Sequence, residues 1–211
     1  CGIGIDSDWL VEKGYRVLAA DISNQMLAEA TDRIPSLEVM EGSIEETLEH
    51  LEPRIFDAAI LNFGVVNCLD LKRLANGLSR CIRPGGIVVI VPMPRFAPAW
   101  LLGALKNGRW GPALARMRST APVDVEGIAI DTRYLSASEI CDVLAPDLRL
   151  KSQRSLGLIL PPPGSRSAGA IGPTHRVAER CLASLPVFRQ MGDHLLLVFE
   201  RRQKEGRQYG F

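Results

Sequence analysis

Short runs of apolar residues recur along the first half of the chain, each bounded by polar or turn-forming residues. The runs at 15–21, 37–42, 56–64 and 87–93 are rich in Val, Ile, Leu and Ala, which is typical of buried β-strands. The run at 56–64 is almost entirely apolar, as expected for a parallel strand that is covered on both faces. The pattern therefore predicts four parallel strands.

Segments with helical spacing separate these runs. Residues 23–34 predict a helix with Ser23 as its N-cap and Pro35 after its last residue. Residues 70–86 predict an amphipathic helix that ends at Pro84 and two glycines. The alternation predicts an α/β fold of the Rossmann-like, doubly wound kind, with a mostly parallel sheet and helices on both of its faces.

The second half of the chain has a less regular pattern. Residues 98–119 have helical spacing interrupted by Gly108, Gly111 and Pro112. We expect residues 98–135 to form a helical cap above the sheet that selects the substrate. Strands are further predicted at 125–135, 148–160 and 192–202, helices at 136–145 and 174–185, and a loop at 161–173.

Composition describes an ordinary globular chain of 211 residues, which we expect to form one domain over residues 1–211. The 25 basic and 24 acidic side chains nearly balance, which gives no support to nucleic acid as a partner. The longest apolar run, 96–105, is about half as long as a membrane span. Five scattered cysteines favour reduced thiols and a cytoplasmic protein.

A glycine turn at the start of the chain, CGIGID, carries the first functional signal. Gly2 and Gly4 would let backbone approach a nucleotide, and Asp21 ends the next predicted strand. In a nucleotide-binding α/β fold a carboxylate at that position accepts hydrogen bonds from both ribose hydroxyls. We therefore interpret the turn and Asp21 as parts of one nucleotide site, although Asp21 and Ser23 could also be a capping pair.

Taken together, these stretches resemble the class I S-adenosylmethionine-dependent methyltransferases. The stretch CGIGIDSDWLVEKGYRVLAADISNQMLAEA is similar to the family's first two motifs, and LNFGVVNCL and LSRCIRPGGIVVIV resemble its fourth and fifth strands with the helix between them. The closing GDHLLLVFERR resembles the family's antiparallel last strand. The resemblance implies methyl transfer from S-adenosyl-L-methionine to a small-molecule acceptor, whose identity the sequence does not reveal.

The resemblance also implies a set of cofactor-binding positions. Gly2 and Gly4 correspond to the glycine motif, and Asp21 with Ile22 to the ribose motif. The family commonly has an acid for the adenine amino group where this chain has Ser43, so Ser43, the backbone of Ile44, or Glu41 or Glu45 are the candidates there. The remaining cofactor candidate is Asn62, beside the expected methyl group.

Acceptor binding is less marked in the sequence. We name Asn67, Arg95 and Tyr134 as candidate substrate contacts, because they follow predicted strands or lie on the cap segment. No catalytic residue is assigned, since methyl transfer needs a base only when the acceptor must lose a proton. His50, His175 and His194 are interpreted as surface or structural histidines, and no metal site is predicted.

Two alternatives remain open. Gly2-x-Gly4-x-x-Ser7 and Asp21 also approach the fingerprint of a nicotinamide-dependent oxidoreductase, although no Tyr-x-x-x-Lys pair accompanies them. A non-catalytic module that keeps the fold is the second alternative, supported by the departure at Ser43.

The family's first strand would lie upstream of Cys1. We therefore expect the chain to be N-terminally truncated, with a gap one strand wide between the strand that ends at Asp21 and the strand that ends near Asn62.

Overall fold

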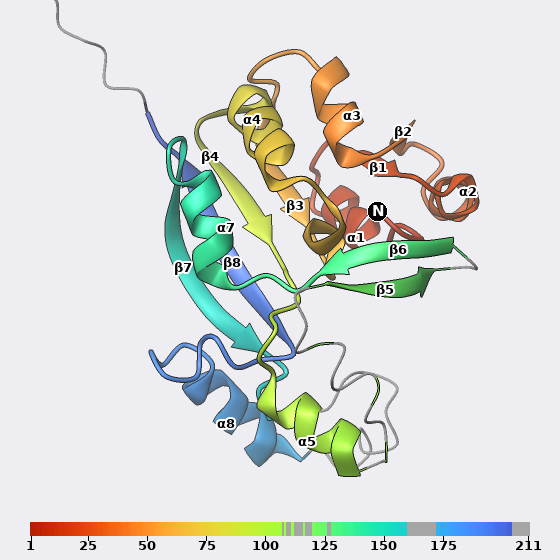
Figure 1. The fold of residues 1–211 in the computed structure, drawn as a ribbon. Helices are drawn as coiled ribbons and strands as arrows, with labels where there is room; N and C mark the ends of the chain where they lie inside the picture. Colours follow the sequence, from red (N-terminus) through yellow and green to blue (C-terminus); the bar gives the residue numbers. More distant parts are fainter. Residues whose placement is uncertain are drawn as a thin grey trace, which may run out of the picture.

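The computed structural model describes residues 1–106, 108, 111, 116, 120–125, 128–159 and 172–203. Its strands form three separate sheets: two strands in parallel, four strands in a mixed sheet, and an antiparallel hairpin (Figure 1). In chain order the strands are β1 (Leu18–Asp21), β2 (Glu38–Glu41), β3 (Phe56–Leu61), β4 (Ile82–Ile90), β5 (Thr120–Val125), β6 (Ile128–Arg133), β7 (Leu148–Leu156) and β8 (His194–Arg201).

Helices alternate with the strands of the first half, and the sequence pattern predicts two of them, near residues 23–34 and 70–86. The first three are α1 (Ile5–Glu12), α2 (Asn24–Arg33) and α3 (Ile44–His50). Ser23 caps α2 by accepting a hydrogen bond from the backbone N–H of Met26. The later helices are the 3-10 helix η1 (Val65–Cys68), α4 (Leu71–Cys81), α5 (Pro98–Lys106), α7 (Ala137–Leu144) and α8 (Pro173–Leu182).

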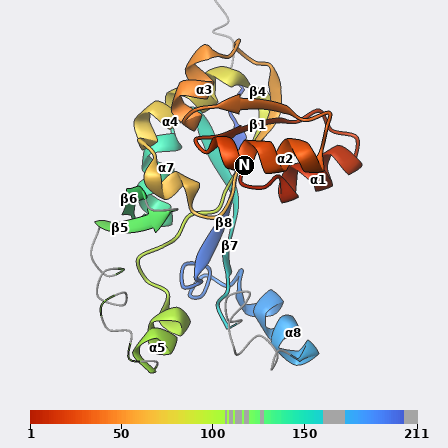
Figure 2. The ribbon, with the colours of Figure 1, turned by 90° about the vertical axis from the view of Figure 1, so that its right-hand side faces the viewer.

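The four-stranded sheet has the order β3-β4-β8-β7. Strands β3 and β4 are parallel, while β8 runs antiparallel to both β4 and β7. The prediction of a mostly parallel, Rossmann-like α/β arrangement with an antiparallel last strand is confirmed. The carboxyl ends of β3 and β4 and the start of β8 consequently lie at one edge of the sheet, toward α5 and α8 (Figures 1 and 2).

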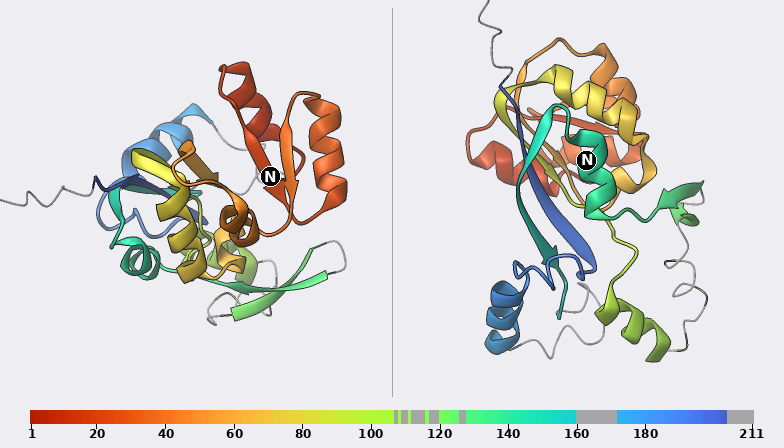
Figure 3. Two further views of the ribbon diagram at one scale, coloured as in Figure 1. Left: turned by 90° about the horizontal axis from the view of Figure 1, so that it is seen from above. Right: turned by 60° about the vertical axis from the view of Figure 1, so that its left-hand side comes forward.

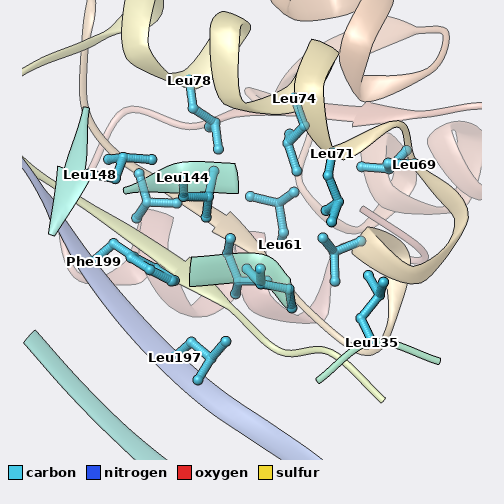
Figure 4. Packing of buried hydrophobic residues seen from close by; sticks show 14 of the residues in the cluster. Leu61, Leu69, Leu71, Leu74, Leu78, Leu135, Leu144, Leu148, Leu197 and Phe199 are labelled. Atoms are coloured by element: carbon cyan, nitrogen blue, oxygen red, sulfur yellow. The ribbon is translucent and has the colours of Figure 1, made fainter. Parts of the chain in front are cut away.

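One face of this sheet carries the main hydrophobic core. Helices α4 and α7 cover it from the same side (Figure 3, left). Strand β8 turns every second side chain into this core, and Phe199 packs there opposite Leu74 and Leu78 of α4 and Leu144 of α7 (Figure 4). Burial of these side chains fixes the helices on the sheet.

The other face of the sheet is more open than the apolar pattern predicts. Ile60 of β3 is 46% exposed and Ile87 of β4 is 36% exposed, so the expectation that β3 is covered on both faces is wrong. Strand β3 pairs with β4 alone, and β1 pairs with β2 alone. Within the described chain, β1 and β3 are therefore not joined by strand hydrogen bonds.

The helix predicted over 70–86 ends earlier, at Cys81, and β4 begins at Ile82. Ile82 pairs with Phe56 of β3, and the register shifts between Phe56 and Ala58. Proline disfavours helical backbone in the residue before it, so Pro84 ends the helix before Arg83 and not at residue 86. Pairing with β3 then draws the remaining residues into the sheet.

The described residues of the segment predicted as a cap do not extend the four-stranded sheet, since β5 and β6 pair there only with each other. It contains α5 and this hairpin, and β5 was not predicted. Arg133 at the end of β6 donates a hydrogen bond to the Leu69 carbonyl just after η1, so the hairpin lies against the segment that follows β3. Trp110 and the loop 161–171 fall outside the described residues.

A matched pair of glycine substitutions tests the packing of α3 on α4. A Cβ on Gly77 of α4 would lie 2.8 Å from Leu48 Cβ, whereas a Cβ on Gly103 of α5 meets nothing within 4 Å. We expect Gly77→Ala to destabilise by ~1–3 kcal/mol, because the overlap outweighs the gain in helix propensity. Gly103→Ala should be neutral or stabilising by up to ~1 kcal/mol. Urea denaturation measures both, and equal effects of the two substitutions would contradict the packing described.

Candidate functional site

The glycine turn adopts backbone that favours glycine. Gly2 and Gly4 have φ values of 56° and 79°, in the left-handed region. Gly4 is also the N-cap of α1, and a Cβ there would lie 3.0 Å from the Cβ of Ala30 in α2. The close approach of the turn to α2 thus requires glycine at position 4.

Asp21 ends β1 and points into this turn, which confirms the predicted geometry. Its Oδ2 accepts hydrogen bonds from the Gly2 N–H at 2.7 Å and from the Cys1 amino group at 2.6 Å, and its Oδ1 accepts one from the Ser23 N–H. Burial raises the pKa of Asp21, but these hydrogen bonds outweigh it and hold the pKa below its ordinary value. The carboxylate is therefore ionised near neutral pH. Ile22, the next residue, is 58% exposed.

Asn62 joins the end of β3 to the start of α1. Its Nδ2 donates to Asp6 Oδ2 at 2.7 Å, and its Oδ1 accepts from the Phe63 N–H. This contact brings the third predicted motif position to the same helix that the Gly2–Gly4 turn opens. Four of the sequence-predicted cofactor residues, Gly2, Gly4, Asp21 and Asn62, are thus brought together around α1.

Phe63 follows Asn62 in a strained conformation. Its φ is 47°, which is uncommon for a bulky residue and costs on the order of 1–3 kcal/mol. Its side chain is 73% exposed, and its ring meets the His194 ring edge-on at 6.0 Å between centroids. Strain of this kind clusters at functional sites, so Phe63 joins the candidate site.

Ser43 is committed to helix capping. Its Oγ accepts from the Glu46 N–H, and the Glu46 carboxylate accepts from the Ser43 N–H. Ile44 begins α3 and packs against the main core. The sequence signal at Ser43 is therefore fully accounted for by a capping box.

The buried position of Asn67 does not match its predicted role as a substrate contact. It is fully buried, and its carboxamide binds the backbone of Met93 and Arg133: Nδ2 donates to both carbonyls, and Oδ1 accepts from the Met93 N–H. These bonds tie η1 to the ends of β4 and β6. Asn67 therefore positions the loops around the site and presents no free group to a substrate.

The two remaining substrate candidates lie where the exits of β4 and β6 meet. Arg95 donates to the Tyr134 carbonyl and forms an ion pair with Glu139 of α7. The Tyr134 ring lies 5.5 Å from the guanidinium of Arg116, which also lies 4.8 Å from the Trp100 ring of α5. Tyr134 therefore borders the sheet edge, whereas Arg95 is engaged in holding α7.

Arg116 is the centre of a buried polar network that sequence analysis missed. Its Nη1 binds Asp193 Oδ1 at 2.6 Å, its Nη2 donates to the Asp193 carbonyl, and its Nε donates to the Pro94 carbonyl. The second carboxylate oxygen of Asp193 lies 3.2 Å from Nδ1 of His194. No motif marks Arg116, because its partner lies 77 residues away in the sequence.

Comparisons with known proteins agree on the class of domain. Residues 1–90 match the model of a methyltransferase domain family. Together with the relatives and solved structures below, this match supports a methyltransferase domain of the class I S-adenosylmethionine-dependent kind.

Curated relatives of this methyltransferase chain share part of its length. A malonyl-[acyl-carrier protein] O-methyltransferase of Salmonella typhimurium is 34% identical over 47% of this chain and 41% of its own length. The enzyme of the same name from Pectobacterium atrosepticum is 32% identical over 74% of this chain and 61% of its own length. A demethylmenaquinone methyltransferase of Chlorobaculum tepidum is 36% identical over 40% of this chain and 35% of its own. The chain thus spans less than two thirds of each.

Solved structures support the fold. An S-adenosylmethionine-dependent methyltransferase of Methanosarcina mazei matches with a TM-score of 0.63 at 16% identity, over 97% of this chain and 90% of its own. A putative methyltransferase of Listeria monocytogenes matches with a TM-score of 0.61 at 15% identity, over 96% of this chain and 87% of its own. Separately, none of the described helices combines the length and apolar character needed to cross a membrane.

The buried ion pair leads to a stability prediction. Asp193→Ala leaves Arg116, whose side chain is 5% exposed, without its carboxylate partner, so we expect a loss of ~3–5 kcal/mol near neutral pH. The matched control is Glu38→Ala, which breaks the exposed pair with Arg16 and should cost under ~1 kcal/mol. Urea denaturation of the three proteins provides the comparison.

The same experiment has a pH dependence of known sign. Burial raises the pKa of Asp193, but hydrogen bonds from His194 and Arg116 outweigh it and lower the pKa below the ordinary value of 3.8. A lowered pKa in the folded state stabilises the protein above pH 3.8, and this contribution is lost as the pH falls through the folded pKa. The difference between wild type and Asp193→Ala should therefore shrink in acid. A difference that grows in acid would contradict this assignment.

Proposed function

We propose that this chain transfers a methyl group from S-adenosyl-L-methionine to a small-molecule acceptor. The observation that carries the proposal is the direct hydrogen bond between the Gly2 N–H and Asp21, with Asn62 reaching the same helix through Asp6. A nucleotide with a ribose diol fits this arrangement, because backbone approaches closely at the turn and an ionised carboxylate stands beside it.

The hydrogen-bonding capacity of Asp21 is compatible with binding of the donor ribose. Asp21 Oδ1 accepts only the Ser23 N–H among the described residues, so one lone pair is available to a hydroxyl. Oδ2 already accepts two hydrogen bonds, and a second hydroxyl would replace the amino group of Cys1 there. Exposed Ile22 offers an apolar surface next to the carboxylate. These residues fit the nucleoside part of the donor.

When bound, the donor supplies an activated methyl group on a positively charged sulfonium. The chain's own part is to bind and orient, because placement in line with the nucleophile provides much of the rate. Asp6 contributes negative charge between α1 and β3, where Asn62 holds it. Negative charge at this edge favours a cationic ligand over a neutral one.

We further propose that residues 98–135 cover the acceptor, with Tyr134 as a contact and Arg95 holding the exit of β4 against α7. Their position at the carboxyl edge of the sheet supports this, since loops at that edge carry substrate choice in such folds. The names of the curated relatives suggest acceptors such as an acyl group on a carrier protein or a quinone precursor. Adenine recognition stays with the backbone of Ile44, because the Ser43 oxygen serves as a cap.

Calorimetry with S-adenosylhomocysteine tests the donor site. Asp21→Ala should weaken binding by roughly 5- to 150-fold, since a ribose without its partner loses about 1–3 kcal/mol. Asp32→Ala is the matched control, because Asp32 is an exposed carboxylate on α2, whereas the hydrogen bonds of the turn go to Asp21. Its affinity should equal that of the wild type.

The same calorimetric titration with NAD distinguishes a methyltransferase from the two alternative functions. Binding of NAD but not of S-adenosylhomocysteine would favour an oxidoreductase, and binding of neither would favour a non-catalytic module. An Asp21→Ala variant that is folded by circular dichroism and binds S-adenosylhomocysteine as tightly as the wild type would overturn the ribose assignment.

A further inference from the structure

The start of β8 holds a histidine in one defined ring orientation. Nδ1 of His194 lies 3.2 Å from Asp193 Oδ2. A carboxylate only accepts hydrogen bonds, so the neutral imidazole must carry its proton on Nδ1 to make this contact. Nε2 is then left with a free lone pair, and it has no hydrogen-bond partner among the described residues.

Asp193 is itself held in place from behind. Two nitrogens of the Arg116 guanidinium bind the Asp193 side chain and its carbonyl, each at 2.6 Å, and the third donates to Pro94 at the exit of β4. One carboxylate oxygen thus faces Arg116 and the other faces His194. Such a buried, bidentate arrangement gives the carboxylate little freedom to turn away from the imidazole.

The ring of His194 lies beside the proposed site of methyl transfer. It meets Phe63 edge-on, and Phe63 directly follows Asn62, the donor-site residue at the end of β3. Leu195 donates a hydrogen bond to Pro92, which fixes the start of β8 against the exit of β4. His194 therefore lies next to the residue that follows Asn62, at the end of β3 where we expect the methyl group.

We propose that His194 is the general base that removes a proton from the acceptor, and that the acceptor is a hydroxyl compound and not an ionised carboxylate. This inference rests on the proposed function. An ionised carboxylate has no proton to lose and would make no use of a base at Nε2 of His194, whereas a hydroxyl requires one.

The methyl-transfer step conserves atoms and charge. When the acceptor oxygen forms its bond to the methyl carbon, the electrons of the carbon–sulfur bond pass to sulfur and the oxygen loses its proton. Nε2 of His194 takes that proton, and Asp193 offsets the charge of the imidazolium. The proton then passes to solvent, which restores the neutral ring.

A histidine that only fixes Asp193 would use the same Nδ1 contact, so the test must separate the two roles. NMR of the ring nitrogens is the first measurement, with His50→Gln and His194→Asn used to assign the signals. His50 is an exposed residue of α3 whose Nδ1 lies 2.7 Å from the Glu46 carbonyl, outside the site. We expect neutral His194 to be protonated on Nδ1, and a ring protonated on Nε2 would overturn the proposal.

The second measurement compares two ligands that differ in one charge. Among the described residues, the charged groups near His194 are Asp193 and, behind it, Arg116, while Phe63 just after β3, Leu156 from β7 and Pro92 beside β4 are uncharged. The positive charge of the sulfonium falls off with distance, so S-adenosylmethionine should shift the ring-nitrogen signals of His194 relative to S-adenosylhomocysteine and leave those of His50 unchanged. Identical His194 signals with the two ligands would place His194 away from the methyl group and overturn the proposal. Failure of both ligands to bind would instead overturn the proposed function.

His194→Asn isolates the base. The asparagine amide can still donate to Asp193 but offers no basic nitrogen, so stability and S-adenosylhomocysteine affinity should stay within about twofold of the wild type. With substituted phenols as acceptors, methyl transfer should fall by ~100-fold or more. Matched benzoates serve as carboxylate acceptors. Full activity of His194→Asn, methylation of the benzoates alone, or methylation of none of the phenols would each contradict the proposal.

Discussion

Burial of one face of the four-stranded sheet under α4 and α7 is the constraint on which the rest of the structure depends. The apolar side chains of β8 that alternate into this core set the register of β8 against β4, and that register places His194 beside the exit of β4. A slip of one residue would turn the buried set outward, so the register is strongly specified. Packing on one side of the sheet thus determines which polar groups meet at its edge.

Polar groups at this edge are positioned by two different means. Asp21 is held by backbone N–H groups of the turn beside it, so its geometry follows from local conformation. Asp193 is held by Arg116 from a distant segment, so its geometry depends on how residues 98–135 lie against the sheet. The geometry around Asp21 is therefore set by local structure, and the geometry around Asp193 by tertiary contacts.

This division explains how much of the protein could be predicted from its sequence. The strands ending near Asp21 and Leu61 and the link between Asp21 and the glycine turn follow from apolar runs and glycine positions, which are local signals. The roles of Asn67, Arg116 and His194 depend on partners far away in the chain. An asparagine after a strand is compatible with a ligand contact, and only the backbone groups of Met93 and Arg133 show that it is a buried tie. Ser43 is the intermediate case, because a capping box and a ligand contact place the same residue type at a helix start.

The strain at Phe63 connects the two sides of the site. A positive φ in a bulky residue persists only where surrounding structure determines it, and here Asn62 accepts the Phe63 N–H while Gly64 donates to Val91 of the neighbouring strand. These two bonds turn the ring outward toward His194 and leave the Asn62 amide directed at Asp6. One tight turn after β3 thus contacts Asp6 of α1 through Asn62 and His194 through Phe63. Any change that relaxes this turn would therefore move both side chains together.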